Sequence, residues 1–228
     1  MFIPLKDENP TSGKTYVTIA LIAINVLIFF WTYLRGMQGF QIITYQFGMI
    51  PSEIMQGIEL TPQFSSPIYF TPFSSMFMHG GIMHLAGNML YLWIFGNNIE
   101  DHVGSVKFII FYLVSGLAAA FLFIVFSPDS EIPMVGASGA IAGVMGAYLV
   151  LYPKAKIMTL LFLFYFIRII RVPAVVVLGF WFVYQLFMSM ASGGGGGVAW
   201  LAHVGGFAFG WVWFKIFNLK RKNRPVVY

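Results

Sequence analysis

The sequence has few charged residues. Asp, Glu, Lys and Arg make up only 9% of it, whereas hydrophobic residues make up 59%. A soluble domain of ordinary composition carries about 25% charged residues, so this chain lacks the polar surface that would keep it in water. It therefore belongs in a lipid bilayer. Since a spanning helix needs about 20 mainly apolar residues, residues 1–228 have room for six spans, and we expect a single domain.

Cysteine is absent, which excludes disulfides and thiolate metal sites. No His-Glu-x-x-His string occurs either, and the acidic residues all fall in segments that we expect to be loops, so we expect neither a metal ion nor a cofactor. The net charge of +5 could indicate nucleic-acid binding. Basic residues flank membrane spans by rule, however, so we expect no nucleic-acid partner.

Long apolar stretches recur along the chain and predict an all-α membrane protein built as a six-helix bundle. The expected spans are residues 16–34, 80–98, 106–126, 136–152, 172–190 and 198–217. The fifth begins at Pro173, a favourable first-turn residue. One further apolar segment, residues 157–167, is too short to span, so we place it at the cytoplasmic interface as a hairpin or a short helix.

The distribution of basic residues predicts the orientation. With six spans both termini lie on the same side of the membrane. If that side is the cytoplasm, 12 of the 13 Lys and Arg residues lie inside and only Arg35 lies outside. The inner residues are Lys6, Lys14, Lys107, Lys154, Lys156, Arg168, Arg171, Lys215, Lys220, Arg221, Lys222 and Arg224. The positive-inside rule therefore places both termini in the cytoplasm and the glycine run 193–197 outside.

The segment from Gly36 to Ser74 then becomes a long outer loop between the first two spans. Structureless loops of this length are uncommon in compact domains. Because it is rich in Ile, Phe, Met and Tyr, we expect it to fold and to lie partly in the outer leaflet.

Four polar side chains fall inside the expected spans at a similar depth: His84, Asn88, Ser138 and His203. At 1.5 Å per residue from the inner charged boundary, all four lie roughly 6–12 Å below the outer surface of the hydrocarbon core. A single buried histidine is usually structural, but ionisable residues within a membrane are costly and mark functional sites. Their coincidence in depth on three helices favours one shared site.

Ser138 stands at the start of the fourth span, next to small residues in the string Gly136-Ala137-Ser138-Gly139. The unpaired N–H groups at a helix N-terminus favour an anion, and a tetrahedral intermediate at Ser138 would place its oxyanion there. A serine in such a string is also a common N-cap, so that alternative stays open. Gly206 and Gly210 in the sixth span permit close helix packing, which would bring His203 to Ser138.

Three motifs resemble those of the rhomboid intramembrane serine proteases: HGGIMHLAGNMLYLW at residues 79–93, GASGAIAG at 136–143 and AHVGG at 202–206. Their order, spacing and span numbers agree with the family over about residues 15–217. The resemblance implies an enzyme without an extra soluble domain, in which Ser138 attacks the scissile carbonyl and His203 is its base. By the same resemblance, Asn88, His84 and the N–H of Ser138 would stabilise the oxyanion, and His79 would be a structural residue hydrogen-bonded near the outer loop.

The resemblance also implies single-span membrane proteins as substrates and a prokaryotic cell membrane as the location. Since a span cannot leave the bilayer, substrates must enter laterally, and we expect the fifth span, with Trp181 and Phe182, to form the gate. Two positions depart from patterns found in some members: Phe70-Thr71 replaces Trp-Arg in the outer loop, and Ala142 replaces a Tyr that stacks on the base. Two alternatives stay open: an inactive relative that binds membrane clients, and a small channel or transporter.

Overall fold

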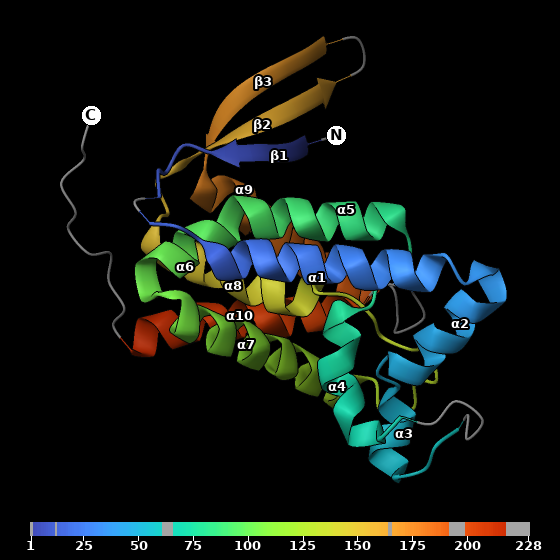
Figure 1. The fold of residues 1–228 in the computed structure, drawn as a ribbon. Helices are drawn as coiled ribbons and strands as arrows, with labels where there is room; N and C mark the ends of the chain where they lie inside the picture. Colours follow the sequence, from blue (N-terminus) through green and yellow to red (C-terminus); the bar gives the residue numbers. More distant parts are fainter. Residues whose placement is uncertain (1, 12, 61–65, 164–165, 192–198, 218–228) are drawn as a thin grey trace.

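The computed structural model describes residues 2–11, 13–60, 66–163, 166–191 and 199–217. Most of them are helical (Figure 1). The helices are α1 (Tyr16–Tyr33), α2 (Gly36–Phe47), α3 (Pro51–Gln56), α4 (Thr71–Ser74), α5 (Ile82–Tyr91), α6 (Asn97–Val103), α7 (Ser105–Phe126), α8 (Ser138–Leu151), α9 (Ala174–Ala191) and α10 (Trp200–Ile216). A π-helical turn, Leu92–Gly96, joins α5 to α6, and 3-10 turns at Ile68–Phe70 and Ser75–Phe77 flank α4.

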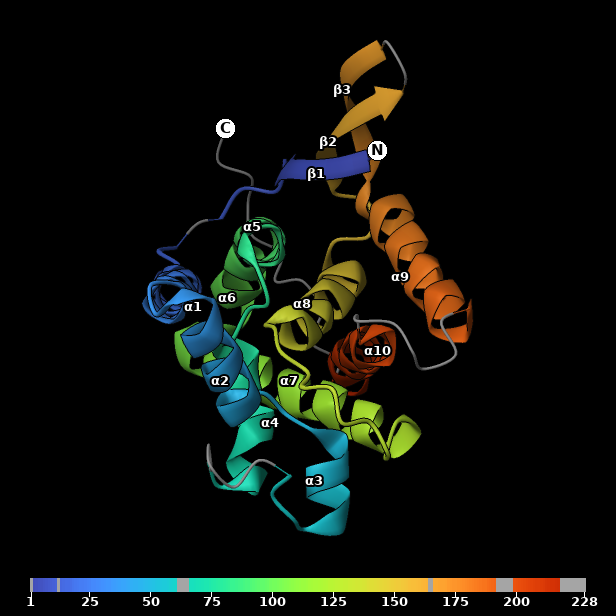
Figure 2. The same cartoon turned by 90° about the vertical axis from the view of Figure 1, so that its right-hand side faces the viewer.

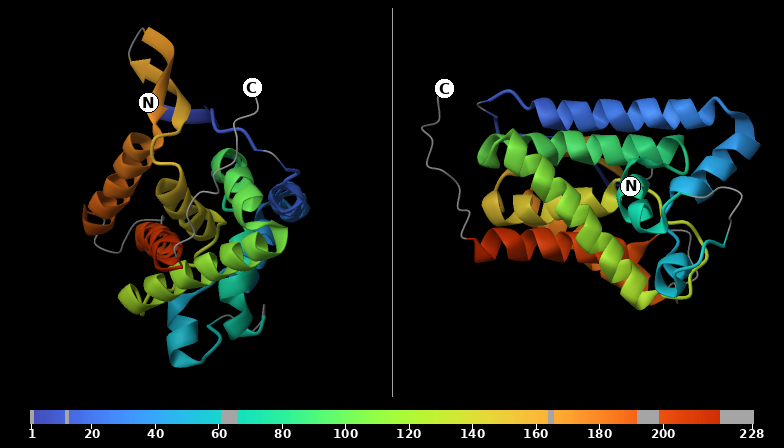
Figure 3. Two further views of the ribbon diagram at one scale, coloured as in Figure 1. Left: turned by 90° about the vertical axis from the view of Figure 1, so that its left-hand side faces the viewer. Right: turned by 60° about the horizontal axis from the view of Figure 1, so that its bottom comes forward.

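Five of the expected spans coincide with one helix each, to within two residues at each end, namely α1, α7, α8, α9 and α10. The expected span 80–98 is instead formed by α5, the π-helical turn and α6, which runs on to Val103. Successive long helices alternate in direction: α1, α7 and α9 run one way, and α5, α8 and α10 run the other way (Figures 1 and 3). Within the described residues, α1, α7 and α9 are long and apolar enough to cross a membrane, whereas α8, with 14 residues, is a shorter apolar helix. The total of six spans stays a prediction.

Helix α8 lies in the middle of the bundle, surrounded by α5, α7, α9 and α10 (Figure 2). Every residue from Gly139 to Tyr148 is buried. A helix that is apolar all round must be buried on all sides, and here it forms the centre of the core. In its first turn, Gly139 lies against Ala119 of α7 and the carbonyl of Ala202 of α10.

The outer segment folds, as expected. It forms α2, α3 and α4: α2 follows the C-terminal end of α1, and α3 and α4 lie at the side of the bundle, against α7 (Figures 1 and 3). Large apolar side chains remain exposed on this segment, among them Met37, Met55 and Tyr69. Such a surface is compatible with lipid contact, and its place in the outer leaflet stays a prediction.

A three-stranded antiparallel sheet corrects the all-α prediction. Strands β1 (Phe2–Asp7), β2 (Lys156–Leu163) and β3 (Phe166–Pro173) pair in that order. The sheet projects from the bundle beside the start of α9 (Figures 1 and 2). For residues 157–167 the hairpin alternative was right and the short helix was wrong. The hairpin also extends to Pro173, so this proline ends β3 and α9 begins at Ala174.

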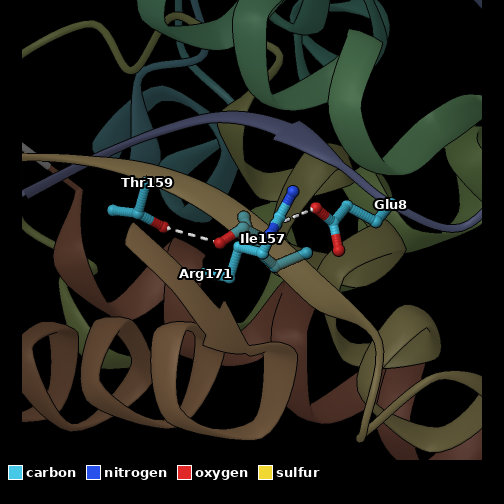
Figure 4. Close-up of polar contacts among 4 residues, drawn as sticks. All are labelled: Glu8, Ile157, Thr159 and Arg171. Carbon is cyan, nitrogen blue, oxygen red and sulfur yellow. Dashed lines mark hydrogen bonds and ion pairs between the residues drawn. The ribbon is translucent and has the colours of Figure 1, made fainter. Parts of the chain in front are cut away.

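Strand β1 was not expected, because the residues before the first span gave no strand signal. β1 supplies the missing edge partner: Asp7 pairs with Ile157 and Ile157 with Val172. Figure 4 shows the ion pair of Arg171 with Glu8, which joins β3 to the end of β1, and the hydrogen bond from Thr159 Oγ1 to the carbonyl of Ile157. The N-terminal segment thereby covers one edge of the hairpin.

Asp7 connects this sheet to the bundle. Its carboxylate is almost fully buried and accepts hydrogen bonds from Tyr148 Oη of α8 at 2.9 Å and from Asn98 Nδ2 of α6 at 2.8 Å. Burial raises the pKa of Asp7 above its usual value of 3.8, although these hydrogen bonds oppose the shift. The N-terminal strand is thus held to two helices by one buried acid.

A second buried acid, Glu100, stabilises the start of α1. Its carboxylate accepts the N–H groups of Val17 at 2.9 Å and Thr18 at 2.7 Å, and the hydroxyl of Ser105 at 2.6 Å. The first N–H groups of a helix have no intrahelical acceptor and favour a negative charge. Glu100 lies in α6 and not in a loop as the sequence suggested.

Two sequence features used for the orientation lie outside the described residues, namely the glycine run 193–197 and the basic residues of the C-terminal tail, 218–228.

Candidate active site

The structure brings Ser138 and His203 together. Ser138 is the first residue of α8, and His203 lies in the first turn of α10. The Ser138 Oγ and His203 Nε2 atoms are 2.8 Å apart, which is hydrogen-bond distance for a hydroxyl and an imidazole. A serine and a histidine in this arrangement form the pair that general-base activation of a nucleophile requires.

The turn that leads into α8 requires a glycine at position 136. Gly136 has φ +132°, a conformation that residues with a side chain rarely adopt. A Cβ atom there would lie 2.8 Å from His84 Nε2 and 3.4 Å from Ser138 Oγ. The glycine therefore leaves space in which the His84 ring and the Ser138 hydroxyl face the same small volume.

Close contact between α8 and α10 explains how the dyad forms. A Cβ atom at Gly206 would collide with the carbonyl of Gly139, and one at Gly210 would collide with the carbonyl of Gly143. The two backbones are thus in direct contact over two turns. Gly139 adjoins Ser138 and Gly206 lies about one turn after His203, so the predicted small-residue contact positions both members of the dyad.

Three candidate donors lie around Ser138. As the first residue of α8, Ser138 has an N–H group without an intrahelical acceptor. Asn88, in the second turn of α5, is 8% exposed, and its Nδ2 has no hydrogen-bond partner among the described residues. His84, one turn earlier on the same face, lines the same cavity. A buried amide donor without a partner is costly unless a ligand satisfies it.

His79 lies beside this group and not in it. It is 2% exposed, does not line the cavity, and its ring packs edge-on against His84 with 5.2 Å between ring centroids. This contact fixes one side of the His84 ring, which fits a structural residue. The hydrogen bond expected for His79 is not found: neither of its ring nitrogens has a hydrogen-bond partner among the described residues.

A cavity of about 980 Å³ contains these groups. Its walls come mainly from α5, α7, α8, α9, the start of α10 and the segment 130–136 before α8. Ser138, His203, Asn88 and His84 all line it, so the sequence-predicted candidates for chemistry share one space. No group of three or more His, Asp or Glu residues that could hold a metal ion occurs in the described part of the chain.

The two residues expected at the gate occupy different places. Trp181 lines the cavity and lies against the base, with 5.9 Å between the ring centroids of Trp181 and His203. Phe182 is not part of the cavity wall; it stacks on Phe207 of α10 at 4.7 Å. Trp181 thus lies against His203, whereas Phe182 packs α9 against α10.

One residue of the site was missed by the sequence analysis. Gln185 of α9 is 4% exposed, lines the cavity, and its Oε1 lies 2.8 Å from His203 Nδ1. A usable signal was present, because a glutamine within an apolar span is unusual and it stands four residues after Trp181, on the same helix face. Gln185 belongs to none of the three motifs at residues 79–93, 136–143 and 202–206.

Comparison with known proteins gives matches over the part of the chain that contains these residues. The family model described as Rhomboid domain matches residues 68–219. The chain is 33% identical over 138 residues to "Rhomboid protease GluP" of Bacillus subtilis (strain 168), a match that covers 60% of this chain and 25% of that protein. It is 31% identical over 162 residues to "Rhomboid protein 1, mitochondrial" of Saccharomyces cerevisiae, which covers 66% and 43%.

A third relative is "Presenilin-associated rhomboid-like protein, mitochondrial" of Pongo abelii, 29% identical over 152 residues, which covers 66% of this chain and 36% of that protein. The matched parts thus span between a quarter and less than half of the length of these relatives. Together with the apolar helices, the matches identify an integral membrane protein.

Proposed function

Because this chain belongs to the rhomboid family, we propose that it is a serine endopeptidase that cleaves the membrane-spanning segments of other membrane proteins. The observation that carries the proposal is the 2.8 Å contact between Ser138 Oγ and His203 Nε2 inside a cavity of about 980 Å³. His203 accepts the Ser138 proton as the hydroxyl attacks the scissile carbonyl. The same imidazolium then donates that proton to the leaving amine.

The groups around Ser138 support stabilisation of the intermediate. The oxyanion that forms on the scissile carbonyl accepts hydrogen bonds from the Ser138 N–H and the Asn88 Nδ2, with His84 as a third donor. Donors that are already in place stabilise developing charge without reorganisation, and one such donor contributes roughly 10²–10³-fold to turnover. The unpartnered Asn88 amide is the strongest support for this role.

The substrates we propose are single-span membrane proteins. A continuous helix hides its carbonyls in i→i−4 hydrogen bonds, so the scissile segment must unwind near the cavity, and Gly, Pro or β-branched residues lower that cost. The Gly136 turn leaves little room beside Ser138, so the residue before the cut should be small. Substrates enter laterally between α5 and α9, both of which contribute residues to the cavity lining.

We further propose a cell-membrane protein of prokaryotic type with six spans and both termini in the cytoplasm. The distribution of Lys and Arg supports this orientation, and the alternating direction of the long helices is compatible with it (Figure 3). Tags placed at the N-terminus and in the glycine run 193–197 test it, since the first should be cytoplasmic and the second external.

The alternatives find less support. An inactive client-binding relative would have no need for a serine and a histidine at hydrogen-bond distance. A channel or transporter would need polar groups along a whole passage, whereas the part of α8 beyond its first residue is apolar and buried.

The test is cleavage of a fluorogenic transmembrane peptide by purified protein. The parent should release the product, and Ser138→Ala and His203→Ala should each abolish release while the protein stays folded in detergent. Because the two residues act as a unit, the double variant should be little worse than either single variant. Turnover by Ser138→Ala close to the parent rate would contradict the proposal.

A peptide panel tests the substrate class separately. Ala before the cut should be cleaved faster than Phe, and a helix breaker near the cut should raise the rate. Equal rates across the panel would contradict this description of the substrate even if the dyad holds.

A further inference from the structure

We propose that Gln185 is the positioning residue that orients His203, and that it makes α9 part of the catalytic apparatus. This inference rests on the proposed function, because it assigns a partner to the base of the same dyad. The role that an acidic residue has in a Ser-His-Asp triad is here performed by a neutral amide from a different helix.

The first step is the tautomer. Gln185 Oε1 lies 2.8 Å from His203 Nδ1. A carbonyl oxygen can only accept a hydrogen bond, so Nδ1 carries the proton. The other ring nitrogen, Nε2, then presents its lone pair to the Ser138 hydroxyl at 2.8 Å. The Gln185 contact therefore selects the one neutral tautomer in which His203 can act as a base.

The second step is orientation. The residue at position 142 is alanine, which has no ring to lie on the imidazole, so α8 contributes the nucleophile but no support for the base. The rings near His203 are those of Trp181, at 5.9 Å, and Trp200, at 6.2 Å and perpendicular. Gln185 adds the directional contact, because a hydrogen bond fixes the rotation of the ring, which aromatic packing leaves freer.

The third step is burial. Gln185 is 4% exposed although it lies on α9, whose neighbouring residues Tyr184 and Leu186 are exposed. A buried amide that lost its partner would leave polar groups unsatisfied. The Gln185–His203 bond is therefore retained as long as α9 stays against α10.

The fourth step links α9 to activity. Gln185 and Trp181 lie four residues apart on one face of α9, and both contact His203. Displacement of α9 from α10 by more than about an ångström would stretch this hydrogen bond beyond its normal range. When α9 moves away from α10 to admit a substrate, the orientation of the His203 ring is therefore no longer fixed. When α9 packs against α10 again, the hydrogen bond reforms and the dyad becomes active.

The variants that test this differ in one property at a time. Gln185→Met keeps an unbranched chain of similar length but removes the carbonyl acceptor, and Gln185→Glu keeps an acceptor and adds a negative charge. Ser189→Ala, one turn further along the same helix, is the matched control, since among the described residues the Ser189 hydroxyl bonds the carbonyl of Leu186 and no group of the cavity.

For Gln185→Met we expect kcat on the transmembrane peptide to fall about 10²-fold, within the range that a positioned base contributes, while KM and the unfolding temperature change little. For Gln185→Glu we expect activity within about tenfold of the parent, and an acid limb of the pH–rate profile that moves to higher pH, because the added charge stabilises the imidazolium. Ser189→Ala should match the parent in both.

A folded Gln185→Met variant with the parent kcat would overturn the inference, as would a Gln185→Glu variant with an unshifted pH profile. These results are distinguishable from failure of the proposed function, in which the parent itself would not cleave or Ser138→Ala would cleave normally. The glutamate variant keeps the test decisive even if the methionine variant does not fold.

Discussion

The carbonyl of Gly139 in α8 lies so close to Gly206 in α10 that a Cβ atom at position 206 would overlap it. Ser138 directly precedes Gly139, and His203 lies three residues before Gly206. The contact between the two backbones therefore sets the separation of Ser138 and His203, the proposed nucleophile and base. The glycines of the two helices are part of the active-site geometry and not only of the packing.

Gly206→Ala should consequently lower both stability and activity. Overpacking a tight contact costs about 1–3 kcal/mol, and separation of α8 from α10 should lengthen the contact between Ser138 and His203. Gly179→Ala is the control, because a Cβ at Gly179 meets nothing within 4 Å; it should be neutral or stabilising by up to about 1 kcal/mol. Thermal unfolding in detergent and peptide cleavage measure both effects. Parent-like behaviour of Gly206→Ala would refute this account.

Asn88→Ala should slow the chemical step and leave binding largely unchanged. Loss of one oxyanion donor reduces kcat by roughly 10²–10³-fold. Asn25→Ala provides the contrast: Asn25 is also buried in a helix, but its amide bonds the carbonyl of Leu21 and does not line the cavity. That variant should change stability and not turnover. A rise in KM at constant kcat for Asn88→Ala would indicate a packing or binding residue instead.

The raised pKa of Asp7 predicts a pH dependence of stability. The folded state holds the Asp7 proton more tightly than the unfolded state, whose pKa is near 3.8. Stability is therefore unaffected by this group below about pH 3.8 and decreases as pH rises from there through the folded pKa. Asp7→Asn keeps an acceptor for Tyr148 and removes the titration. Its unfolding temperature relative to the parent should increase with pH; a constant difference would contradict the prediction.

Phe182 and Trp181 should respond in opposite ways to truncation. Phe182→Ala weakens the stacking of α9 on Phe207 and should raise the cleavage rate of a transmembrane substrate several-fold if lateral entry limits turnover. Trp181→Ala removes a ring that lies against His203 and should slow the reaction of Ser138 with a small soluble phosphonate. That probe does not need lateral entry, so Phe182→Ala should not accelerate its reaction. Acceleration of both reactions by Phe182→Ala would argue against a gate.

Much of the site was predictable because it depends on local chemistry. The sequence itself shows apolar segments of about the length of a span, the glycines beside Ser138 and the polar side chains at one depth. They indicate His84, Asn88, Ser138 and His203 from the sequence alone. Gln185 was missed although a glutamine within an apolar span is unusual, because no motif includes it and its contact with His203 arises only from the packing of α9 against α10.

The sequence by itself determined the membrane environment, the extent of the long helices and the serine and histidine candidates, since these follow from hydrophobicity and residue type at fixed spacing. Tertiary structure alone decided that residues 2–7 form a strand on the 156–173 hairpin, that Asp7 is buried against Tyr148, and that Glu100 caps α1. In each case the two interacting residues are at least 80 positions apart in the chain. No local sequence pattern specifies which distant residue becomes the partner. Side chains of ordinary type acquire these roles only when the fold removes them from water and requires each buried polar group to find a partner.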